Sequence, residues 1–341
     1  MYEFLVKSLP LKHVIRDIAE ELNTDYSSIS NFYRVDIPAA FGSGFIEGVD
    51  FESGFGMIKY HCTFNERTTI NFTFNLIHPL KFLYCYKNNF KHKFPEMEAI
   101  HSVQQYESLI VGSKDQYGHV LIFEKDEAIR ITSLEIDRKR FSIKLREILD
   151  SEESTNELIK AVKDTRAKTH FYYKGKYSVE IADIIDEVPL EERSPLLNYL
   201  VHYGKSYEVL WKQIENYYED VSEKTIRHIL KKKDVEVIKR VCEYIADHIN
   251  LPLTVNKLES TFGLSSRKLQ ELFNELHNES VNGYIQNQRL KAAMNYIVNS
   301  DMNVSEVADA IGISSKSYFS KIFKDKYGIS PSYYIKKSRE K

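Results

Sequence analysis

Cysteine is scarce in this sequence, and its placement excludes several kinds of protein. The 341 residues contain three cysteines, Cys62, Cys85 and Cys242. They lie too far apart for a C-x-x-C metal or redox motif, and an odd number cannot close a disulfide framework. A reducing compartment suits such a chain, so we expect a cytoplasmic protein.

Long apolar runs are absent as well. No stretch of the sequence approaches the roughly eighteen apolar residues that a membrane span requires, so no membrane partner is expected. The first residues show no basic tip followed by an apolar run and a small-residue cleavage site, which is the pattern of a secretion signal. Both observations favour a cytoplasmic location.

Charge of one sign does not dominate the whole chain, because 47 Lys and Arg face 49 Asp and Glu. The division along the chain is uneven. Residues 231–341 contain 18 basic and 13 acidic residues, a net charge of +5, and the preceding residues contain 29 and 36, a net charge of −7. A basic tail behind an acidic front is typical of a nucleic-acid-binding module joined to a domain without that role.

The first 150 residues carry mainly strand patterns. A short amphipathic helix is predicted over residues 11–22, and strands are predicted between residues 44 and 136. Apolar and polar residues alternate over residues 60–64, as in a strand with one buried face. Turn signals such as Lys87-Asn88-Asn89 separate short antiparallel strands. A β-sandwich or small barrel is therefore expected.

From Ser151 onward the apolar period becomes helical. Apolar residues recur three and four apart at Ile181, Ile184, Ile185, Leu196, Leu197, Leu200 and Val201. This pattern predicts a helical hairpin, continued over residues 207–218. The basic run Lys231-Lys232-Lys233 is expected to be a solvated linker.

Two segments of the tail match each other, at residues 254–284 and 303–334, and each has the signals of a helix, a tight turn and a second helix. One extra residue in the second copy shifts the offset from 49 to 50 within its second helix. The matched pairs are Gly263 with Gly312, Ser265 with Ser314, Phe273 with Phe323, Asn278 with Gly328, Ser280 with Ser330 and Tyr284 with Tyr334.

The second copy is consistent in its local physics. Asn303 and Glu306 form a capping pair at the start of the first helix, which buries Val304, Val307, Ala308 and Ile311. Gly312 then provides the left-handed residue that ends the helix, and Ser314 is expected to cap the next one. The inward face of that next helix is predicted to be Tyr318, Phe319, Ile322 and Phe323. Ser330-Pro331 opens a further helix.

An exposed Ser, Lys and Arg face at the start of a second helix is what a major-groove reader needs. In the second copy it comprises Ser315, Lys316, Ser317, Ser320 and Lys321, and in the first copy Ser266, Arg267, Gln270 and Glu271. A continuous helix predicted over residues 281–298 joins the copies. Its length of roughly 27 Å is comparable to the roughly 34 Å between major-groove faces one turn apart, so two readers on a stiff rod could enter successive grooves.

The tail resembles the AraC/XylS family of bacterial transcription regulators over roughly the last 100 residues. The residues that carry the resemblance are Gly263-Leu264-Ser265, Phe273, Arg289-Leu290-x-x-Ala293, Ser305-x-Val307-Ala308-x-x-x-Gly312, Ser317-Tyr318-Phe319-Ser320, Phe323-Lys324 and Gly328-x-Ser330-Pro331. The sequence departs from the family pattern at Glu259, Asn278 and Val281. Glu259, with Glu271 and Glu275, predicts that the first copy holds DNA less tightly than the second.

The resemblance implies a cupin-like sensor barrel followed by helices that dimerise. The phrases at residues 37–38, 78–82 and 136–141 are similar to a branch of such sensor domains. We therefore expect a multidomain chain: a mainly-β cupin-like domain (1–150), a helical hairpin and dimerisation region (151–222), a basic linker (223–234) and an all-α DNA-binding domain with two helix-turn-helix units (235–341). Implied partners are promoter DNA, RNA polymerase, a small-molecule effector and a second copy of the chain. No cofactor is expected.

The function expected is that of a sequence-specific, effector-responsive transcription activator rather than an enzyme. Base readout is assigned to Ser266, Arg267, Gln270, Ser315, Lys316, Ser317, Ser320 and Lys321. Contacts with the DNA backbone are assigned to Ser265, Lys268, Ser314, Tyr318, Lys324, Lys326, Lys336 and Lys337.

Several alternatives compete with parts of this interpretation. One is an enzyme with a DNA-binding tail, either a metal-dependent cupin or a DNA-repair methyltransferase, and another is a non-specific architectural protein. A cupin metal site would need an H-x-H motif, whereas Cys62 and Thr63 follow His61, and the isolated histidines are interpreted as structural or surface residues: His78, His92, His101 and His119.

Three further features have two possible interpretations each. Residues 18–30 could pass for a third helix-turn-helix, but an ordinary helix and loop on the barrel is favoured. Cys62 and Cys85 are interpreted as buried packing residues rather than oxidant sensors. Aromatic side chains crowd one region and are expected to fill the β core rather than line a ligand pocket; they are Phe72, Phe74, Phe82, Tyr84 and Tyr86.

Overall fold

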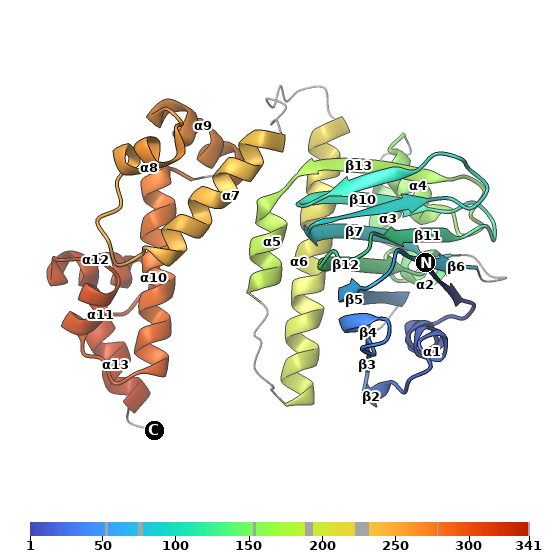
Figure 1. Cartoon of the computed structure of the whole chain (residues 1–341), viewed down its shortest axis with the longest axis horizontal. Coiled ribbons are helices and arrows are strands. Elements are labelled where there is room, and N and C mark those ends of the chain that lie inside the picture. Colours follow the sequence, from blue (N-terminus) through green and yellow to red (C-terminus); the bar gives the residue numbers. More distant parts are fainter. Residues whose placement is uncertain are drawn as a thin grey trace. The chain divides into compact units, whose positions relative to one another are not determined.

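The chain divides into two compact units, Met1–Arg227 and His228–Lys341. The first is mainly β and the second is helical (Figure 1), which confirms the predicted fold class. No described helix is both long and apolar enough to cross a membrane. The computed structural model describes residues 1–51, 54–73, 78–152, 155–187, 194–221, 232–277 and 279–339.

The described strands of the first unit form two sheets. A five-stranded sheet has the order β1-β6-β11-β8-β9, and an eight-stranded sheet has the order β13-β10-β7-β12-β5-β4-β3-β2. Apart from the parallel pair β1 and β6, neighbouring strands are antiparallel. The strands are β1 (Tyr2–Val6), β2 (Ser27–Ile29), β3 (Phe32–Asp36), β4 (Gly42–Asp50), β5 (Phe55–Phe64), β6 (Thr68–Phe72), β7 (Leu80–Lys87), β8 (Asn89–Lys93), β9 (His101–Gln104), β10 (Glu107–Gly112), β11 (His119–Phe123), β12 (Ile129–Ile136) and β13 (Phe171–Tyr177).

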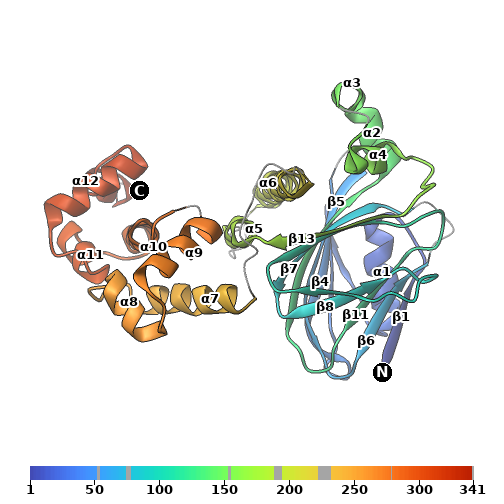
Figure 2. The ribbon, with the colours of Figure 1, turned by 90° about the horizontal axis from the view of Figure 1, so that it is seen from above.

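Six described helices accompany these sheets, and α2, α3 and α4 gather at one end of the β-domain (Figure 2). The long helix α6 packs against α5 and β13. The helices are α1 (Leu11–Glu21), α2 (Arg138–Lys144), α3 (Arg146–Ser151), α4 (Glu157–Lys163), α5 (Val179–Asp186) and α6 (Pro195–Val221). The helices α1, α5 and α6 were all predicted, although Leu196, Leu197 and Leu200 of α6 are 66%, 49% and 54% exposed.

Strand alternation produces two cores on opposite faces of the larger sheet. Leu83 and Cys85 of β7 face the core between the sheets, and Phe82 and Tyr84 face a second core that includes residues of α5 and α6. Phe72 belongs to the first core. The crowded aromatic residues therefore fill two cores rather than one pocket, Tyr86 is only partly buried, and Phe74 lies outside the described residues.

The sequence patterns did not predict β1, β2 or β13. The strand β13 lies in the region expected to be helical and pairs with β10 at the edge of the larger sheet. After α1 the chain forms β2 rather than a second helix, so residues 18–30 contain no helix-turn-helix. Instead, Val14, Ile15 and Ile18 of α1 are buried in the barrel core.

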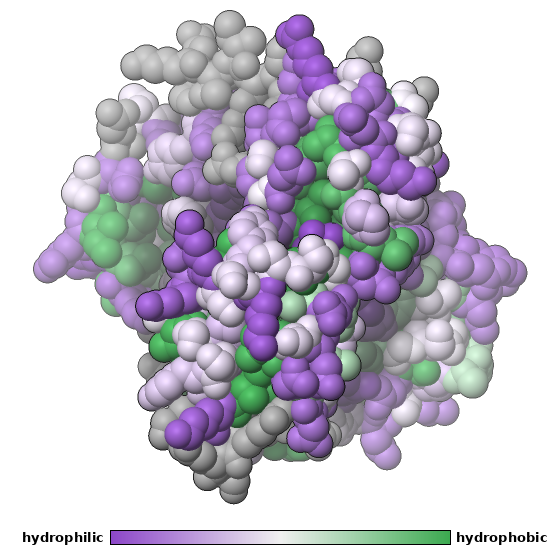
Figure 3. Space-filling model, turned by 90° about the vertical axis from the view of Figure 1, so that its left-hand side faces the viewer, coloured by the Kyte–Doolittle hydropathy of each residue, from purple (hydrophilic) through white to green (hydrophobic). Residues whose placement is uncertain are grey.

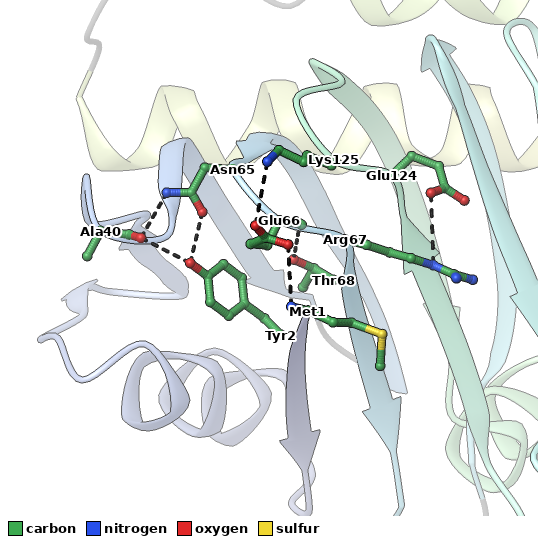
Figure 4. Close-up of polar contacts among 9 residues, drawn as sticks. All are labelled: Met1, Tyr2, Ala40, Asn65, Glu66, Arg67, Thr68, Glu124 and Lys125. Carbon is green, nitrogen blue, oxygen red and sulfur yellow. Dashed lines mark hydrogen bonds and ion pairs between the residues drawn. The ribbon is translucent and has the colours of Figure 1, made fainter.

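A polar network holds the parallel edge strand β1 against the turn between β5 and β6 (Figure 4). The Glu66 carboxylate forms ion pairs with the Met1 amine at 3.4 Å and with Lys125 Nζ at 3.5 Å. The hydroxyl of Tyr2 donates to Asn65 Oδ1 at 2.9 Å, and Asn65 Nδ2 donates to the Ala40 carbonyl oxygen at 2.9 Å. The contacts of Met1 and Tyr2 join segments about sixty residues apart in the sequence.

Cys62 and Cys85 are buried in the β core, which confirms their interpretation as packing residues. Burial raises the pKa of each thiol to about 12 because the thiolate would lose its solvation. Both side chains therefore remain neutral near neutral pH.

Three histidines lie inside the β-domain, and His78, His92 and His119 are all fully buried. The Nε2 atom of His92 lies 3.1 Å from Nδ1 of His119, and the ring centres of His78 and His119 are 5.8 Å apart. Among the described residues, no group of three or more His, Cys, Asp or Glu side chains could hold a metal ion. His92 and His119 lie on the paired strands β8 and β11, and the register of these strands brings the two rings together.

The pair His92 and His119 makes the stability of the first unit dependent on pH. Burial lowers the pKa of His92 from 6.5 to about 3, and it lowers that of His119 well below 6.5, with further lowering by the neighbouring Lys81. Only the unfolded chain takes up these protons easily. The contribution of the two neutral histidines to the free energy of unfolding is therefore fully present above pH 6.5 and is lost as the pH drops toward 3. The expected slope is about 1.4 kcal/mol per pH unit for each histidine.

Urea unfolding at a series of pH values measures this slope. The variant His92→Gln/His119→Gln should have a shallower dependence between pH 6.5 and 4.5. An unchanged slope in that variant would show that other groups cause the acid sensitivity.

The second unit consists of helices in the described residues. The helices are α7 (Lys232–Asp247), α8 (Val255–Phe262), α9 (Ser266–His277), α10 (Val281–Asn299), α11 (Val304–Ala310), α12 (Lys316–Tyr327) and α13 (Pro331–Arg339). The pairs α8 with α9 and α11 with α12 are the two predicted helix-turn-helix units. Helix α10 contacts α9, α11 and α13, and it confirms the continuous helix expected between the copies.

Gly263 and Gly312 both have a left-handed backbone, with φ values of +66° and +69°, as predicted for Gly312. Their surroundings differ. A Cβ atom on Gly312 would lie 2.7 Å from the carbonyl oxygen of Asn250, whereas a Cβ atom on Gly263 would meet nothing within 4 Å.

We predict that Gly312→Ala destabilises the helical unit more than Gly263→Ala. Both variants incur the left-handed penalty of about 1–2 kcal/mol, and only the first adds a clash with backbone. Thermal unfolding of the two full-length variants compares them directly. Equal losses would mean that the segment around Asn250 moves aside without cost.

Candidate nucleic-acid interface

The second helix-turn-helix unit begins with a complete capping box. The Asn303 side chain accepts from the backbone N–H groups of Ser305 and Glu306 at 2.9 and 3.2 Å, and Glu306 accepts from the Asn303 N–H at 2.7 Å. This confirms the predicted pair. The box fixes the start of α11, which in turn fixes the direction from which α12 leaves the turn.

Helix α12 is capped by Ser315 and not by Ser314, so the predicted cap was wrong by one residue. The Ser315 hydroxyl accepts from the Tyr318 N–H at 3.2 Å, and Lys316 is the first helical residue. The inward face contains Phe319, Ile322 and Phe323, all buried. With two adjacent serines, sequence alone does not determine which one has the extended backbone that a cap requires.

Tyr318 does not belong to the inward face, contrary to the prediction. Its side chain is 49% exposed, and its hydroxyl donates to Oε1 of Gln286 on α10 at 3.1 Å. The residue therefore lies beside the exposed start of α12.

The outward face of α12 matches the prediction in position. Ser314, Ser315, Lys316, Ser317 and Lys321 are exposed, and Ser320 is partly exposed. Neither Lys316 nor Lys321 makes a hydrogen bond or ion pair within the described part of the chain. The two ammonium groups are thus available to a ligand at the first turns of the helix. Figure 3 shows the molecule from the left-hand side of Figure 1, where hydrophilic residues surround smaller hydrophobic patches.

The lysines assigned to the DNA backbone have different surroundings. Lys324 and Lys336 are exposed. Lys326 Nζ donates to Asn287 Oδ1 at 2.8 Å, and burial lowers the pKa of this lysine, with a smaller contribution from Lys291. The side chain of Lys337 lies outside the described residues. Lys326 therefore also has a structural contact with α10.

The first helix-turn-helix unit, α8 and α9, is built on the same plan. The Thr254 hydroxyl accepts from the Lys257 N–H at 3.2 Å at the start of α8, and the Ser265 hydroxyl accepts from the Lys268 N–H at 3.2 Å at the start of α9. Leu269, Leu272 and Phe273 form the buried face of α9. Asn278 lies outside the described residues.

The two caps locate the extra residue of the second copy. Ser265 and Ser315 are the equivalent caps, and the buried residues Leu269 and Phe319 follow each of them at the same distance. The offset is therefore already 50 at the start of the second helix. The extra residue lies in the turn, not within the second helix as the sequence alignment suggested.

The polar face of α9 is held by contacts within its own unit. Arg267 Nε donates to Glu271 Oε1 at 2.8 Å, and the Ser266 hydroxyl donates to a carboxylate oxygen of Glu259. Lys268 lies 3.5 Å from Asp234 of α7. The amide of Gln270 donates to Asn274 and accepts from the N–H of Val281. These side chains are brought together as predicted, but with acidic partners that α12 does not have among the described residues.

Helix α10 holds the two helix-turn-helix units at a fixed separation. Its 19 residues span roughly 28 Å at 1.5 Å per residue. Tyr284 packs edge-on against Phe273 of the first unit, with ring centres 5.3 Å apart. Leu290, Ala293 and Ile297 are buried in the core of the second unit. Both helix-turn-helix units therefore share one rigid element.

We predict that Ser315→Ala destabilises the second helix-turn-helix unit by about 1 kcal/mol because it removes the α12 cap. Ser314→Ala should have little effect, because the Ser314 side chain makes no hydrogen bond to the described residues. Chemical unfolding of the two full-length variants distinguishes the caps, and the reverse order would reassign the start of α12.

Comparison with known proteins identifies the helical unit. The family model of a helix-turn-helix domain matches residues 258–337. Regulatory protein PocR of Salmonella typhimurium is 27% identical over 103 residues, which cover 30% of this chain and 34% of PocR. Regulatory protein SoxS of the same organism is 26% identical over 99 residues, which cover 29% of this chain and 92% of SoxS.

Among solved structures, a probable AraC family transcriptional regulator from Rhodopseudomonas palustris is 26% identical, with a TM-score of 0.28, over 30% of this chain and 97% of that one. The match spans about a third of the length of a relative such as PocR. The similarity therefore concerns the C-terminal part of the chain. Residues 258–337 form an AraC-type helix-turn-helix domain.

Proposed function

We propose that the whole chain is a sequence-specific DNA-binding transcription regulator that reads two successive major grooves. The observation that carries this proposal is the exposed start of α12, where Lys316, Ser317 and Lys321 project from a capped helix. Lysine amines donate to guanine acceptors and short hydroxyls make mixed contacts in the major groove. The equivalent helix α9 packs against the same stiff helix, α10.

The roles of individual side chains follow from their positions. Base reading falls to Ser315, Lys316, Ser317, Ser320 and Lys321 in the second unit, and to Ser266, Arg267 and Gln270 in the first. Phosphate contacts fall to residues near these faces, namely Ser265, Lys268, Ser314, Tyr318, Lys324, Lys326, Lys336 and Lys337. Phosphate contacts set the register on the duplex, and base contacts select the sequence.

The β-rich unit, Met1–Arg227, supplies regulation in this proposal. Its two sheets and the long helix α6 suit a sensor that binds a small-molecule effector and pairs with a second copy of the chain, and the exposed Leu196, Leu197 and Leu200 on α6 are consistent with such pairing. The regulator acts in the cytoplasm, as an activator that contacts RNA polymerase. A regulator rather than an enzyme is supported by the relatives, which are named as regulatory proteins.

Lys316→Ala should weaken binding to a selected site by about 1–3 kcal/mol and change binding to random DNA little, because a base contact is lost. Lys336→Ala is the matched control. It should weaken binding to both duplexes alike and reduce the slope of log affinity against log salt concentration by about 1. Sites selected by the full chain from a pool of random duplexes supply the specific probe. Equal losses for Lys316→Ala on both duplexes would exclude base reading by this residue.

A further inference from the structure

The two reading helices have opposite electrostatic surroundings. On α12, Lys316 and Lys321 have no ion pair within the described part of the chain, and both are exposed. On α9, Arg267 is paired with Glu271 at 2.8 Å, and Lys268 lies 3.5 Å from Asp234. The units share a fold but not an available positive charge.

Arg267 is the long donor with which the first unit could read a guanine. Its side chain is 90% exposed, and Glu271, its partner one turn along the helix, is 49% exposed. An exposed pair four residues apart is weak, so the arginine can leave it at little cost. The carboxylate, however, stays on the face that would enter the groove.

A second carboxylate extends the acidic surroundings. Glu259 of α8 accepts from the hydroxyl of Ser266 at the first position of α9. Gln270 is occupied at both ends of its amide, by Asn274 and by the N–H of Val281. All three predicted base readers of the first unit are therefore engaged within the unit.

We propose that Glu259 and Glu271 keep the reading face of the first unit from making strong DNA contacts, so that base selection rests on the second unit. This inference rests on the proposed function and specifies how the two units share it. Two carboxylates beside the phosphates of a groove are repelled by the duplex, and the cost is independent of its sequence. Glu259 and Glu271 thus lower affinity generally, and the first unit positions the chain more than it reads.

The opposite role for Glu271 is chemically conceivable and separable. A glutamate can accept a hydrogen bond from the N4 amino group of cytosine in the major groove. In that case removing the carboxylate would lose affinity for selected sites and relax a preference for cytosine. Repulsion predicts a gain of affinity on every sequence.

The test uses full-length variants with a selected duplex and a random duplex. Glu271→Gln should raise affinity for both by about 3- to 10-fold at low salt, and the gain should shrink as salt rises. Arg267→Ala alone should change affinity less than 2-fold, by roughly the effect of a weak surface contact. In the Glu271→Gln background, Arg267→Ala should leave most of the gain, because the gain comes from the removed carboxylate repulsion.

Glu243→Gln provides the matched control. Glu243 lies one turn from Lys239 on α7, at 3.7 Å, so the substitution breaks a similar pair and changes the charge equally, on a helix that is not a reading helix. A gain no larger than that of the control would overturn the proposal, as would a loss of cytosine preference in Glu271→Gln. It would also be overturned if Arg267→Ala relaxed base preference as strongly as Lys316→Ala.

Failure of this inference is distinguishable from failure of the proposed function. If Lys316→Ala discriminates between the duplexes while the Glu271 series shows no gain, the regulator stands and the acidic restraint does not. If no variant or native chain prefers a selected duplex, the proposed function itself fails.

Discussion

The burial of one helix in two cores is the constraint on which the DNA-binding half of the molecule depends. The N-terminal part of α10 packs on α9 through Tyr284, and Leu290, Ala293 and Ile297 pack into the core with α11 and α12. Because closely packed interiors resist small displacements, neither unit can turn independently of the other. A flexible linker in place of α10 would let each unit search alone. A packed helix fixes both the distance and the angle between the readers.

Within this rigid frame, small local differences determine what each unit can do. The cap at Ser315 exposes the first turns of α12, where two lysine amines have no ion pair among the described residues, whereas α9 starts among Glu259, Glu271 and Asp234. The two helix-turn-helix units thus share a fold while their surfaces differ. A rigid spacer makes such divergence useful, since a unit that mainly positions the chain still places its partner in the correct groove.

Sequence reasoning succeeded where a single local interaction determines the structure. The pattern Asn303-x-x-Glu306 predicts its own capping box, Gly312 its own left-handed turn, and the apolar spacing of α10 its helix. It failed where neighbours compete or distant segments meet. Adjacent serines offered two caps, and an exposed tyrosine at a nominally inward position was placed by Gln286 of another helix.

The β-rich unit, Met1–Arg227, illustrates the failure that arises where distant segments meet. The strand β13 is short, lies at a sheet edge and is recognisable only through its pairing with β10. His78, His92 and His119 are isolated in the sequence, and strand register alone brings His92 and His119 within 3.1 Å. Such convergence depends on pairings between segments far apart, which no local pattern contains.

The most direct test of the central claim is the pattern of bases in sites selected by the full chain from random duplexes. A rigid pair of unequal readers predicts one strongly determined segment and one weakly determined segment about 10 base pairs away, one helical turn, at constant spacing. Two equally determined segments would contradict the inequality of the units. A variable spacing between the segments would contradict the rigid helix on which the account depends.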